Sequence, residues 1–278
     1  MSDPSWQSED APDPIRLDLI GWVMVILRGV PLAILVFGGL IILLTLRLFE
    51  SPLCGVQRPV TPFVSQFVCR NALRILGMGF RTSGELMRER GALVANHSSW
   101  LDIFALNACK RVYFVSKAEV AKWPGIGWLA RATGTVFIER NRKKAREQTR
   151  VFEERLKAGH KLLFFPEGTS TDGLRVLPFK TTLFAAFFAD ELLDFMYVQP
   201  VSVVFHAPKE QPARFYGWWG DMDFGPHFLQ TLAARRQGSV ELIYHAPAKV
   251  SDFENRKTLA AHCEDAVRHA HSLAQLEK

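Results

Sequence analysis

The sequence predicts an α/β fold, with a largely parallel sheet flanked by helices and membrane-associated helices ahead of it. Short apolar runs rich in β-branched and aromatic residues alternate with longer segments whose apolar residues recur at helical spacing. This alternation is typical of parallel sheets, because consecutive parallel strands need a crossover connection. A long apolar stretch near the N-terminus predicts the membrane-associated part.

The first 50 residues divide into two parts. Residues 1–18 are acidic and proline-rich, and we expect a flexible lead-in. Residues 19–50 are expected to be a membrane-anchoring helical segment, since 29–46 is an uncharged 18-residue run that as a helix would reach ~27 Å, about one hydrocarbon core. Either one helix spans the bilayer, or a break at 28–31 makes two helices that enter one leaflet and return; the second is favoured. A cleavable signal peptide is not indicated, because no small-residue cleavage site follows a short apolar core.

The next segment, residues 51–90, is expected to be a connector followed by a helix at 63–78. An α/β domain is then predicted over 91–278. Its expected strands are 92–95, 112–116, 135–138, 161–165, 196–205 and 240–244, and its expected helices are 101–109, 127–132, 141–158, 183–193 and 253–276.

Directly after the first of these strands, residues 95–103 read ANHSSWLDI, which places His97 and Asp102 five positions apart. A neutral imidazole accepts a proton from a hydroxyl only if the correct ring nitrogen is bare, and a carboxylate bonded to the other nitrogen fixes that tautomer. A polar turn capped by Ser98 or Ser99 would let Asp102 point back toward the ring. The pair is therefore a candidate base with its orienting acid, although a structural His–Asp bond is an equally simple explanation of this spacing alone.

Polar groups also follow three other predicted strands, at Lys117, Arg140 and Glu167. The carboxyl ends of parallel strands meet at one edge of a sheet, so we expect one site. In the loop after residue 165, Gly168 allows close approach of the backbone to a ligand, and Thr169 supplies hydroxyl and amide donors. Such a loop suits an anionic head group.

Four segments between about residues 93 and 204 carry a resemblance to a known family, and they are 96–102 (NHSSWLD), 134–140 (GTVFIER), 165–169 (FPEGT) and 198–201 (VQPV). Taken in order, they resemble the four blocks of the lysophosphatidic acid acyltransferase family. The resemblance implies acyl transfer from an acyl-CoA or acyl carrier protein thioester to the free hydroxyl of a membrane lysolipid, with that thioester as co-substrate and no cofactor. It implies that His97 is the general base, Asp102 its partner, and Lys117, Arg140, Glu167, Gly168, Thr169 and Ser170 the substrate-binding residues.

The acceptor is less determined by the motifs. Many glycerophosphate-type members carry Arg where this chain has Ser170, and the missing cation weakens the case for a phosphomonoester. By family frequency the expected reaction converts 1-acylglycerol-3-phosphate to phosphatidic acid, with lyso-ornithine lipid as the alternative acceptor. A lipid hydrolase is the alternative from another class, and it lacks a G-x-S-x-G nucleophile motif.

Charge and composition point toward a membrane surface. The net charge is +6, and the basic run at 140–146 is expected to attract anionic lipid head groups. No aromatic or glycine-rich pattern accompanies it, so nucleic acid is not an expected partner. The four cysteines form no C-x-x-C, and Asp221 and Asp223 have no His or Glu at ligand spacing, so no metal site is predicted.

Two further expectations concern position in the cell and in the fold. We expect a bacterial-type inner (cytoplasmic) membrane location with the active site facing the cytoplasm, where thioester donors are available. The aromatic segment 214–224 would either cover the acyl chain at the lipid interface or, as we favour, pack on the core as a surface loop.

Overall fold

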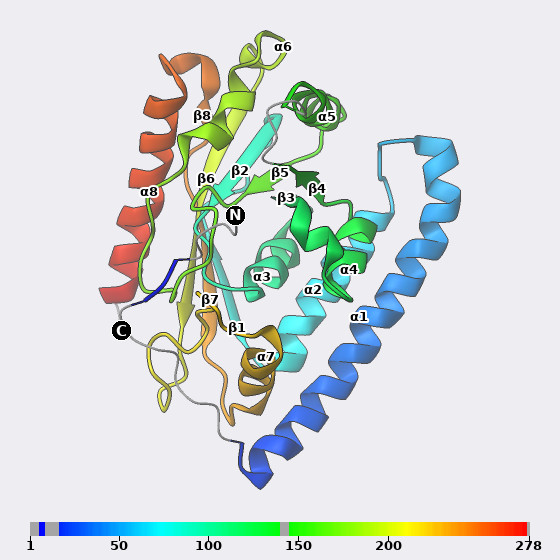
Figure 1. Ribbon diagram of the computed structural model, residues 1–278, viewed down its shortest axis with the longest axis vertical. Coiled ribbons are helices and arrows are strands. Elements are labelled where there is room, and N and C mark those ends of the chain that lie inside the picture. The colour runs from blue at the N-terminus through cyan, green and yellow to red at the C-terminus, as the bar shows by residue number, and fades with distance from the viewer. Residues whose placement is uncertain (1–5, 9–16, 140–144, 277–278) are drawn as a thin grey trace.

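The computed structural model describes residues 6–8, 17–139 and 145–276. These residues form an eight-stranded sheet of order β1-β7-β6-β2-β5-β3-β4, with β8 paired to β6 (Figure 1). Its pairings are parallel except β6–β7 and β6–β8, which confirms the predicted α/β class with a largely parallel sheet. The strands are β1 (Gly79–Ser83), β2 (Gly91–Ala95), β3 (Tyr113–Lys117), β4 (Val136–Ile138), β5 (Leu162–Phe164), β6 (Tyr197–His206), β7 (Ser239–Tyr244) and β8 (Ala248–Lys249).

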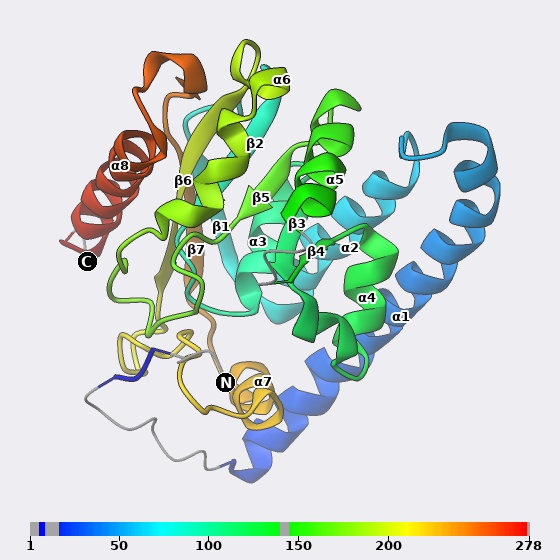
Figure 2. The same ribbon diagram turned by 45° about the horizontal axis from the view of Figure 1, so that its top comes forward.

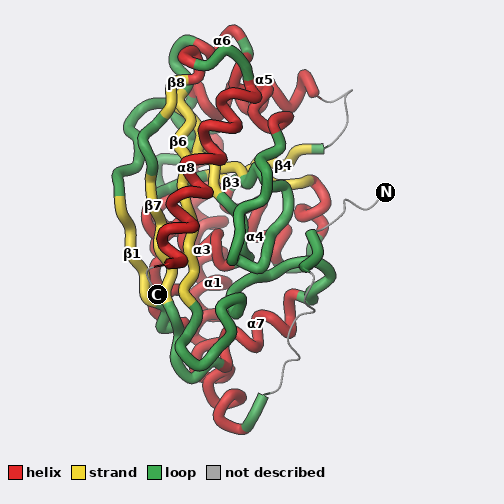
Figure 3. The backbone as a smooth tube through the Cα atoms, turned by 90° about the vertical axis from the view of Figure 1, so that its left-hand side faces the viewer, coloured by secondary structure: helices red, strands yellow, loops and turns green. Residues whose placement is uncertain are grey.

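Helices cover both faces of this sheet. On one face lie α1, α2, α3 and α7, and on the other lie α5, α8 and a 3₁₀ segment (Figures 1 and 2); Figure 3 views the sheet with α8 toward the reader. The helices are α1 (Leu19–Cys54), α2 (Thr61–Leu76), α3 (Leu101–Cys109), α4 (Ile126–Thr133), α5 (Ala145–Lys157), α6 (Asp190–Leu193), α7 (Phe224–Ala233) and α8 (Arg256–Leu276), and the 3₁₀ segment is Thr181–Phe188.

Strand β2 shows why its sequence is apolar throughout. Leu93 and Ala95 pack into the core on the side of α2 and α3, whereas Ala92 and Val94 pack into the core on the side of α5 and α8. A central parallel strand is covered on both faces, so every residue of β2 is buried. The residues that follow β2 are thereby delivered to the middle of the carboxyl edge.

Helix α1 is continuous from Leu19 to Cys54, so the favoured break at 28–31 is wrong. The reason lies in its docking: Arg28 donates from Nη1 to the carbonyl oxygens of Leu232 (2.7 Å) and Ala234, at the end of α7. These contacts hold the helix to the domain at the point where Pro31 removes a backbone hydrogen bond.

Both ends of α1 are fixed to the same domain. At its start, Asp18 accepts a hydrogen bond from Gly21 N and pairs with Arg235 at 2.8 Å. At its end, the buried Glu50 carboxylate accepts hydrogen bonds from the backbone and hydroxyl of Thr61. Most apolar side chains of α1 are nevertheless exposed, and the helix is long and apolar enough to cross a membrane.

Three elements differ from the sequence expectation. No strand is expected before residue 91, yet β1 pairs in parallel with β7 at the sheet edge, where four of its five residues are exposed and no apolar pattern is required. Helix α7 lies in a stretch with no predicted element. The expected helix 183–193 is instead the 3₁₀ segment followed by the short α6.

Candidate active site

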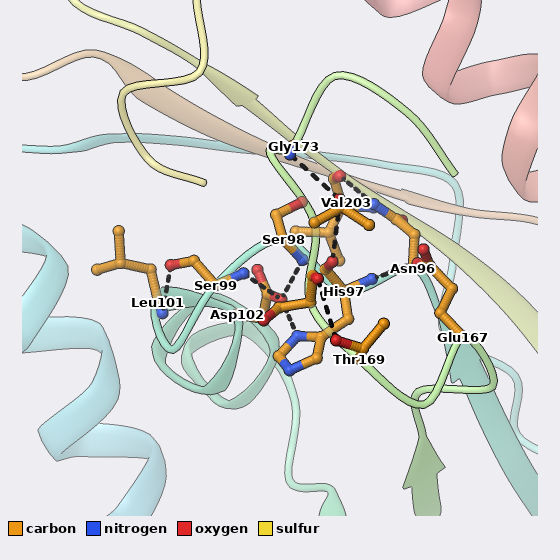
Figure 4. A network of polar contacts seen from close by, with 12 residues as sticks. Asn96, His97, Ser98, Ser99, Leu101, Asp102, Glu167, Thr169, Gly173 and Val203 are labelled. Carbon is orange, nitrogen blue, oxygen red and sulfur yellow. Dashed lines mark hydrogen bonds and ion pairs between the residues drawn. The ribbon is translucent and has the colours of Figure 1, made fainter. Parts of the chain in front are cut away.

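His97 and Asp102 meet in the turn between β2 and α3. His97 Nδ1 lies 2.6 Å from Asp102 Oδ2, and the Asp102 side chain is fully buried, whereas that of His97 is 21% exposed. Figure 4 shows Nδ1 facing the carboxylate and the second ring nitrogen on the far side of the ring. The predicted geometry of the pair is therefore present.

Backbone amides fix the Asp102 carboxylate. Its Oδ2 atom also accepts hydrogen bonds from Ser98 N (2.8 Å) and Ser99 N (3.1 Å), and Ser99 Oγ accepts one from Leu101 N (3.0 Å). Asp102 stands in the first turn of α3, where the helix dipole favours a negative charge. An ionised carboxylate can only accept, so Nδ1 of His97 carries the hydrogen and the lone pair on Nε2 is left for a substrate proton.

The His97 ring also has an aromatic stacking partner. It stacks on Phe165, with ring centroids 4.1 Å apart and an interplanar angle of 16°. Phe165 in turn stacks on Phe114 of β3 at 6.0 Å. The hydrogen bond to Asp102 thus fixes which way the Nδ1 atom of His97 points, and stacking on Phe165 fixes the plane of the ring.

Backbone groups of the neighbouring strand and loops form hydrogen bonds with the residues around His97. Asn96 makes a two-way bond to Val203 of β6, donating from Nδ2 at 2.8 Å and accepting at Oδ1 at 2.7 Å, just beyond the last residue pair of the β2–β6 ladder. Thr171 N donates to His97 O at 3.0 Å, and Trp218 N donates to Ser98 O at 2.9 Å. Three separate segments therefore converge on the turn.

Glu167 takes a place that its sequence position does not reveal. Its Oε1 accepts the backbone N–H of His97 at 2.7 Å (Figure 4). Its Oε2 accepts the backbone N–H of Leu177 at 2.8 Å. Burial raises the pKa of this carboxyl to about 8, although the two amides act in the opposite direction. Through these hydrogen bonds Glu167 connects the loop that carries His97 with the loop that carries Leu177. Direct binding of substrate by its carboxylate stays a prediction.

The other expected binding residues border the same turn. Gly168 adopts a positive φ of 72°, which favours glycine, and the ammonium group of Lys180 lies over it. Thr169 Oγ1 accepts a hydrogen bond from Trp6 N at 3.4 Å, and Ser170 follows it, half-buried. Lys117 ends β3, one strand beyond β5.

Arg140 and the rest of the basic run lie outside the described part of the chain, because residues 140–144 and the side chains of 145 and 146 are not described. The roles expected of Arg140 in substrate binding and of this run at an anionic membrane surface stay predictions.

Two cations near the Gly168 loop were missed from the sequence. Lys180 has its ammonium group over Gly168, and Arg175 pairs with the buried Asp172 at 2.9 Å while its guanidinium carbon lies 5.1 Å from the centroid of the Trp6 ring. The absence of Arg at position 170 could have indicated them, because another cation in the same loop could take its place. Nothing in the lead-in indicates a contact of Trp6 with this region.

The aromatic segment 214–224 packs on the core, as favoured. Phe215, Tyr216 and Trp219 are buried, and the backbone N–H of Trp218 donates to Ser98 O in the turn that carries His97. The segment therefore helps to hold the turn between β2 and α3 in place.

Comparison with known proteins agrees with this geometry. A family model described as acyltransferase matches residues 80–204. The chain is 53% identical over 268 residues to the lyso-ornithine lipid O-acyltransferase of Rhodobacter capsulatus, which covers 96% of this chain and 97% of that protein. The chain belongs to the lysophosphatidic acid acyltransferase family. It is an acyltransferase that acts on lysolipids.

Other members of the acyltransferase family match less of the chain. The lyso-ornithine lipid O-acyltransferase of Brucella abortus is 38% identical over 216 residues, 73% of this chain and 79% of that protein. The 1-acyl-sn-glycerol-3-phosphate acyltransferase of Neisseria gonorrhoeae is 46% identical over 118 residues, 41% of this chain and 46% of that protein. The crystal structure of the acyltransferase PlsC from Thermotoga maritima shares the fold, with a TM-score of 0.60 at 21% identity over 90% of this chain and 95% of that chain.

Proposed function

We propose that this acyltransferase is a lyso-ornithine lipid O-acyltransferase, the alternative that the sequence leaves open beside lysophosphatidate. The observation that carries the proposal is the match to the Rhodobacter capsulatus protein along almost the whole length of both chains. The similarity to the glycerophosphate-type Neisseria protein is confined to less than half of either chain.

The head-group side of the site supports the same acceptor. Ornithine is an amino acid that offers a carboxylate and an ammonium group, whereas lysophosphatidate offers a doubly charged phosphomonoester. The chain has Ser170 in place of Arg, and its nearby Arg175 is already paired with Asp172. A site in which a cation stands beside a carboxylate suits a zwitterionic head group better than a dianion.

The chemistry needs only His97 and an activated donor. As the acceptor hydroxyl oxygen attacks the thioester carbonyl carbon, Nε2 takes the hydroxyl proton, and Asp102 stabilises the imidazolium that forms. The carbon–sulfur bond then breaks, and the leaving thiolate takes that proton from the imidazolium. The products are the ester and free coenzyme A or acyl carrier protein, and no cofactor or covalent enzyme intermediate enters the sequence.

In the same proposal, the exposed side chains and the fixed ends of α1 determine how the protein lies on the membrane. Its exposed apolar side chains favour burial in lipid, while its two ends are fixed to one domain, so we place the helix along the interface of the inner membrane rather than across it. The catalytic edge then faces the cytoplasm, where acyl-CoA and acyl carrier protein are available.

A head-to-head assay tests the acceptor. The purified protein receives an acyl thioester and either lyso-ornithine lipid, lysophosphatidate or no acceptor, and both thiol release and diacyl lipid are measured. We expect ornithine lipid to form with the higher kcat/KM. Faster formation of phosphatidic acid would overturn the acceptor, and thiol release without any diacyl lipid would point to hydrolysis.

A further inference from the structure

A cleft lies at the opposite edge of the sheet from His97. It has a volume of about 540 Å³ and opens between the start of α2, the end of α3 and the residues that lead into β3 and β5. Since β2, β3 and β5 are parallel, the residues before β3 and β5 stand at the amino edge, and His97 stands at the carboxyl edge. The cleft is therefore separate from the acyl-transfer site. Its cationic lining residues are Arg58, Arg70, Lys110, Arg111 and Lys161.

These five cations have no carboxylate partner within ion-pair distance among the described residues. Their contacts are neutral: Arg58 donates to Ala132 O, Lys161 donates to Glu89 O, and Arg111 lies over the Phe63 ring with its guanidinium carbon 4.2 Å from the centroid. The carboxylates of Glu50 and Glu89 act on Arg58 and Lys161 from beyond ion-pair distance. Gathering five like charges in one cleft without a direct ion pair is nevertheless unfavourable for folding. The arrangement therefore points to an anion supplied from outside.

Two buried neutral donors complete the cleft. His160 is 7% exposed, and its Nδ1 accepts a hydrogen bond from Arg155 Nε at 2.6 Å, so its proton is on Nε2. Burial, together with the charge of Arg155, lowers the pKa of His160 to about 4 and keeps the ring neutral. Tyr113, also 7% exposed, stacks on this ring at 4.3 Å. Within the described ranges neither His160 Nε2 nor the Tyr113 hydroxyl has a hydrogen-bond acceptor, and both side chains line the cleft.

An apolar surface borders the mouth of the cleft. Phe63, which lines the cleft, is 53% exposed. Val60, just before α2, is 48% exposed, and Phe67 on α2 is 62% exposed. Helix α2 packs along α1, whose exposed side chains are apolar (Figure 1). A ligand held here would thus have a basic, hydrogen-bond-donating wall for its charged end and an apolar surface for its other end.

We infer that this cleft binds the head group of an anionic phospholipid, with the phosphate among the five cations and the acyl chains along α2. A phosphate supplies several acceptor oxygens, which match a lining that contains donors and cations. A soluble phosphate would satisfy the cations but would leave the apolar side chains of Phe63 and Phe67 exposed to water. The site is distinct from that of the acceptor lysolipid, and it anchors the amino edge of the domain to the membrane.

The test uses the full-length protein in a neutral detergent and measures its melting temperature while phosphatidylglycerol or phosphatidylcholine is added to the micelles. A ligand that binds only the folded state raises the melting temperature. We expect phosphatidylglycerol to raise it and phosphatidylcholine to have no comparable effect. The double variant Lys110→Gln/Arg111→Gln, which changes two exposed side chains, should bind phosphatidylglycerol about fivefold more weakly for each cation removed. Tyr113→Phe should weaken binding without lowering the melting temperature of the lipid-free protein.

The matched control is Lys209→Gln/Lys257→Gln, which removes the same charge from exposed positions outside the cleft and should keep the full phosphatidylglycerol effect. An equal response of the cleft variant and the wild type would overturn the site. An equal loss in the control would show that net charge alone is responsible, which also overturns it. If inorganic phosphate at constant ionic strength raises the melting temperature as much as phosphatidylglycerol, the lipid assignment is wrong.

Discussion

The carboxylate of Glu167 lies between two loops and accepts the backbone N–H of His97 at 2.7 Å, so the loop after β5 determines the position of His97 after β2. The second oxygen of Glu167 holds Leu177, ten residues further along the chain. Glu167 is only 1% exposed in the folded protein and becomes exposed on unfolding. Its affinity for a proton therefore differs between the folded and the unfolded state. The position of His97 thus depends on a buried carboxyl group from a different loop.

A stability measurement against pH follows from this burial. The pKa of Glu167 is raised from 4.5 to about 8 in the folded protein, so the folded state binds this proton more tightly than the unfolded chain does. The contribution to stability is therefore fully present below pH 4.5 and is lost as the pH rises through about 8. We expect the melting temperature of the wild type, measured relative to Glu167→Gln, to fall over this range. Other titrating groups such as His160 are common to both proteins and cancel, and a difference independent of pH would contradict the prediction.

Replacement of His97 by Ala should lower kcat by ~10²–10⁴, because the acceptor hydroxyl loses its proton acceptor. The control is His269→Ala, an exposed histidine of α8, which should leave kcat unchanged. Both variants are compared with the wild type for melting temperature and for release of thiol from the acyl thioester. A folded His97→Ala protein with near-normal turnover would remove His97 from the reaction.

The variant Asp102→Asn tests the negative charge of Asp102 separately from its effect on the tautomer of His97. Since Oδ2 of Asp102 accepts from Ser98 N and Ser99 N, the amide oxygen of an asparagine will take that position and continue to accept from Nδ1 of His97. The tautomer is kept, and only the counter-charge of the imidazolium is lost. We expect a smaller loss of kcat than for His97→Ala, together with a shift of the acid limb of the pH–rate profile to lower pH. An unshifted profile would mean that Asp102 has a structural role alone.

How much of this could be predicted from the sequence depends on the range of the interactions. The strands around β2 and the His97–Asp102 pair follow from local apolar patterns and a five-residue turn, and both are present. Of the four strand ends expected to converge, those carrying His97 and Glu167 are in contact, and Arg140 lies outside the described residues. Strand β1 and the continuity of α1 depend on contacts more than 100 residues away, β1 with β7 and Arg28 with Leu232, and no local pattern encodes them. The inward-facing carboxylate of Glu167 was missed for the same reason, since its partners become neighbours only in the folded protein.

Position 170 should control the choice of acceptor. Ser170→Arg introduces the cation found in many glycerophosphate-type members, and a hydrogen bond to a charged group is worth enough to change kcat/KM by about tenfold or more. We expect the ratio of lysophosphatidate to lyso-ornithine lipid turnover to rise by that factor. Ser170→Gln, which adds length without charge, is the control and should leave the ratio near the wild-type value. An unchanged ratio in the arginine variant would show that the head group is recognised elsewhere.

The orientation of α1 can be decided by chemical labelling. Its first turn is tied to Arg235 and its last turn to Thr61, and these partners belong to one folded domain, so both ends must lie on the same side of the bilayer. In a chain whose four cysteines are replaced by Ser or Ala, Leu19→Cys and Ser51→Cys place single thiols at exposed positions near the two ends. With a membrane-impermeant maleimide applied to intact spheroplasts and then to permeabilised ones, we expect the two thiols to behave alike and to become labelled only after permeabilisation. Lys209→Cys, an exposed position of the catalytic domain, reports the side on which that domain lies. Labelling of one end of α1 before permeabilisation and of the other only afterwards would mean that the helix crosses the membrane, and the docking of Arg28 on α7 would then have to open in the lipid-bound protein.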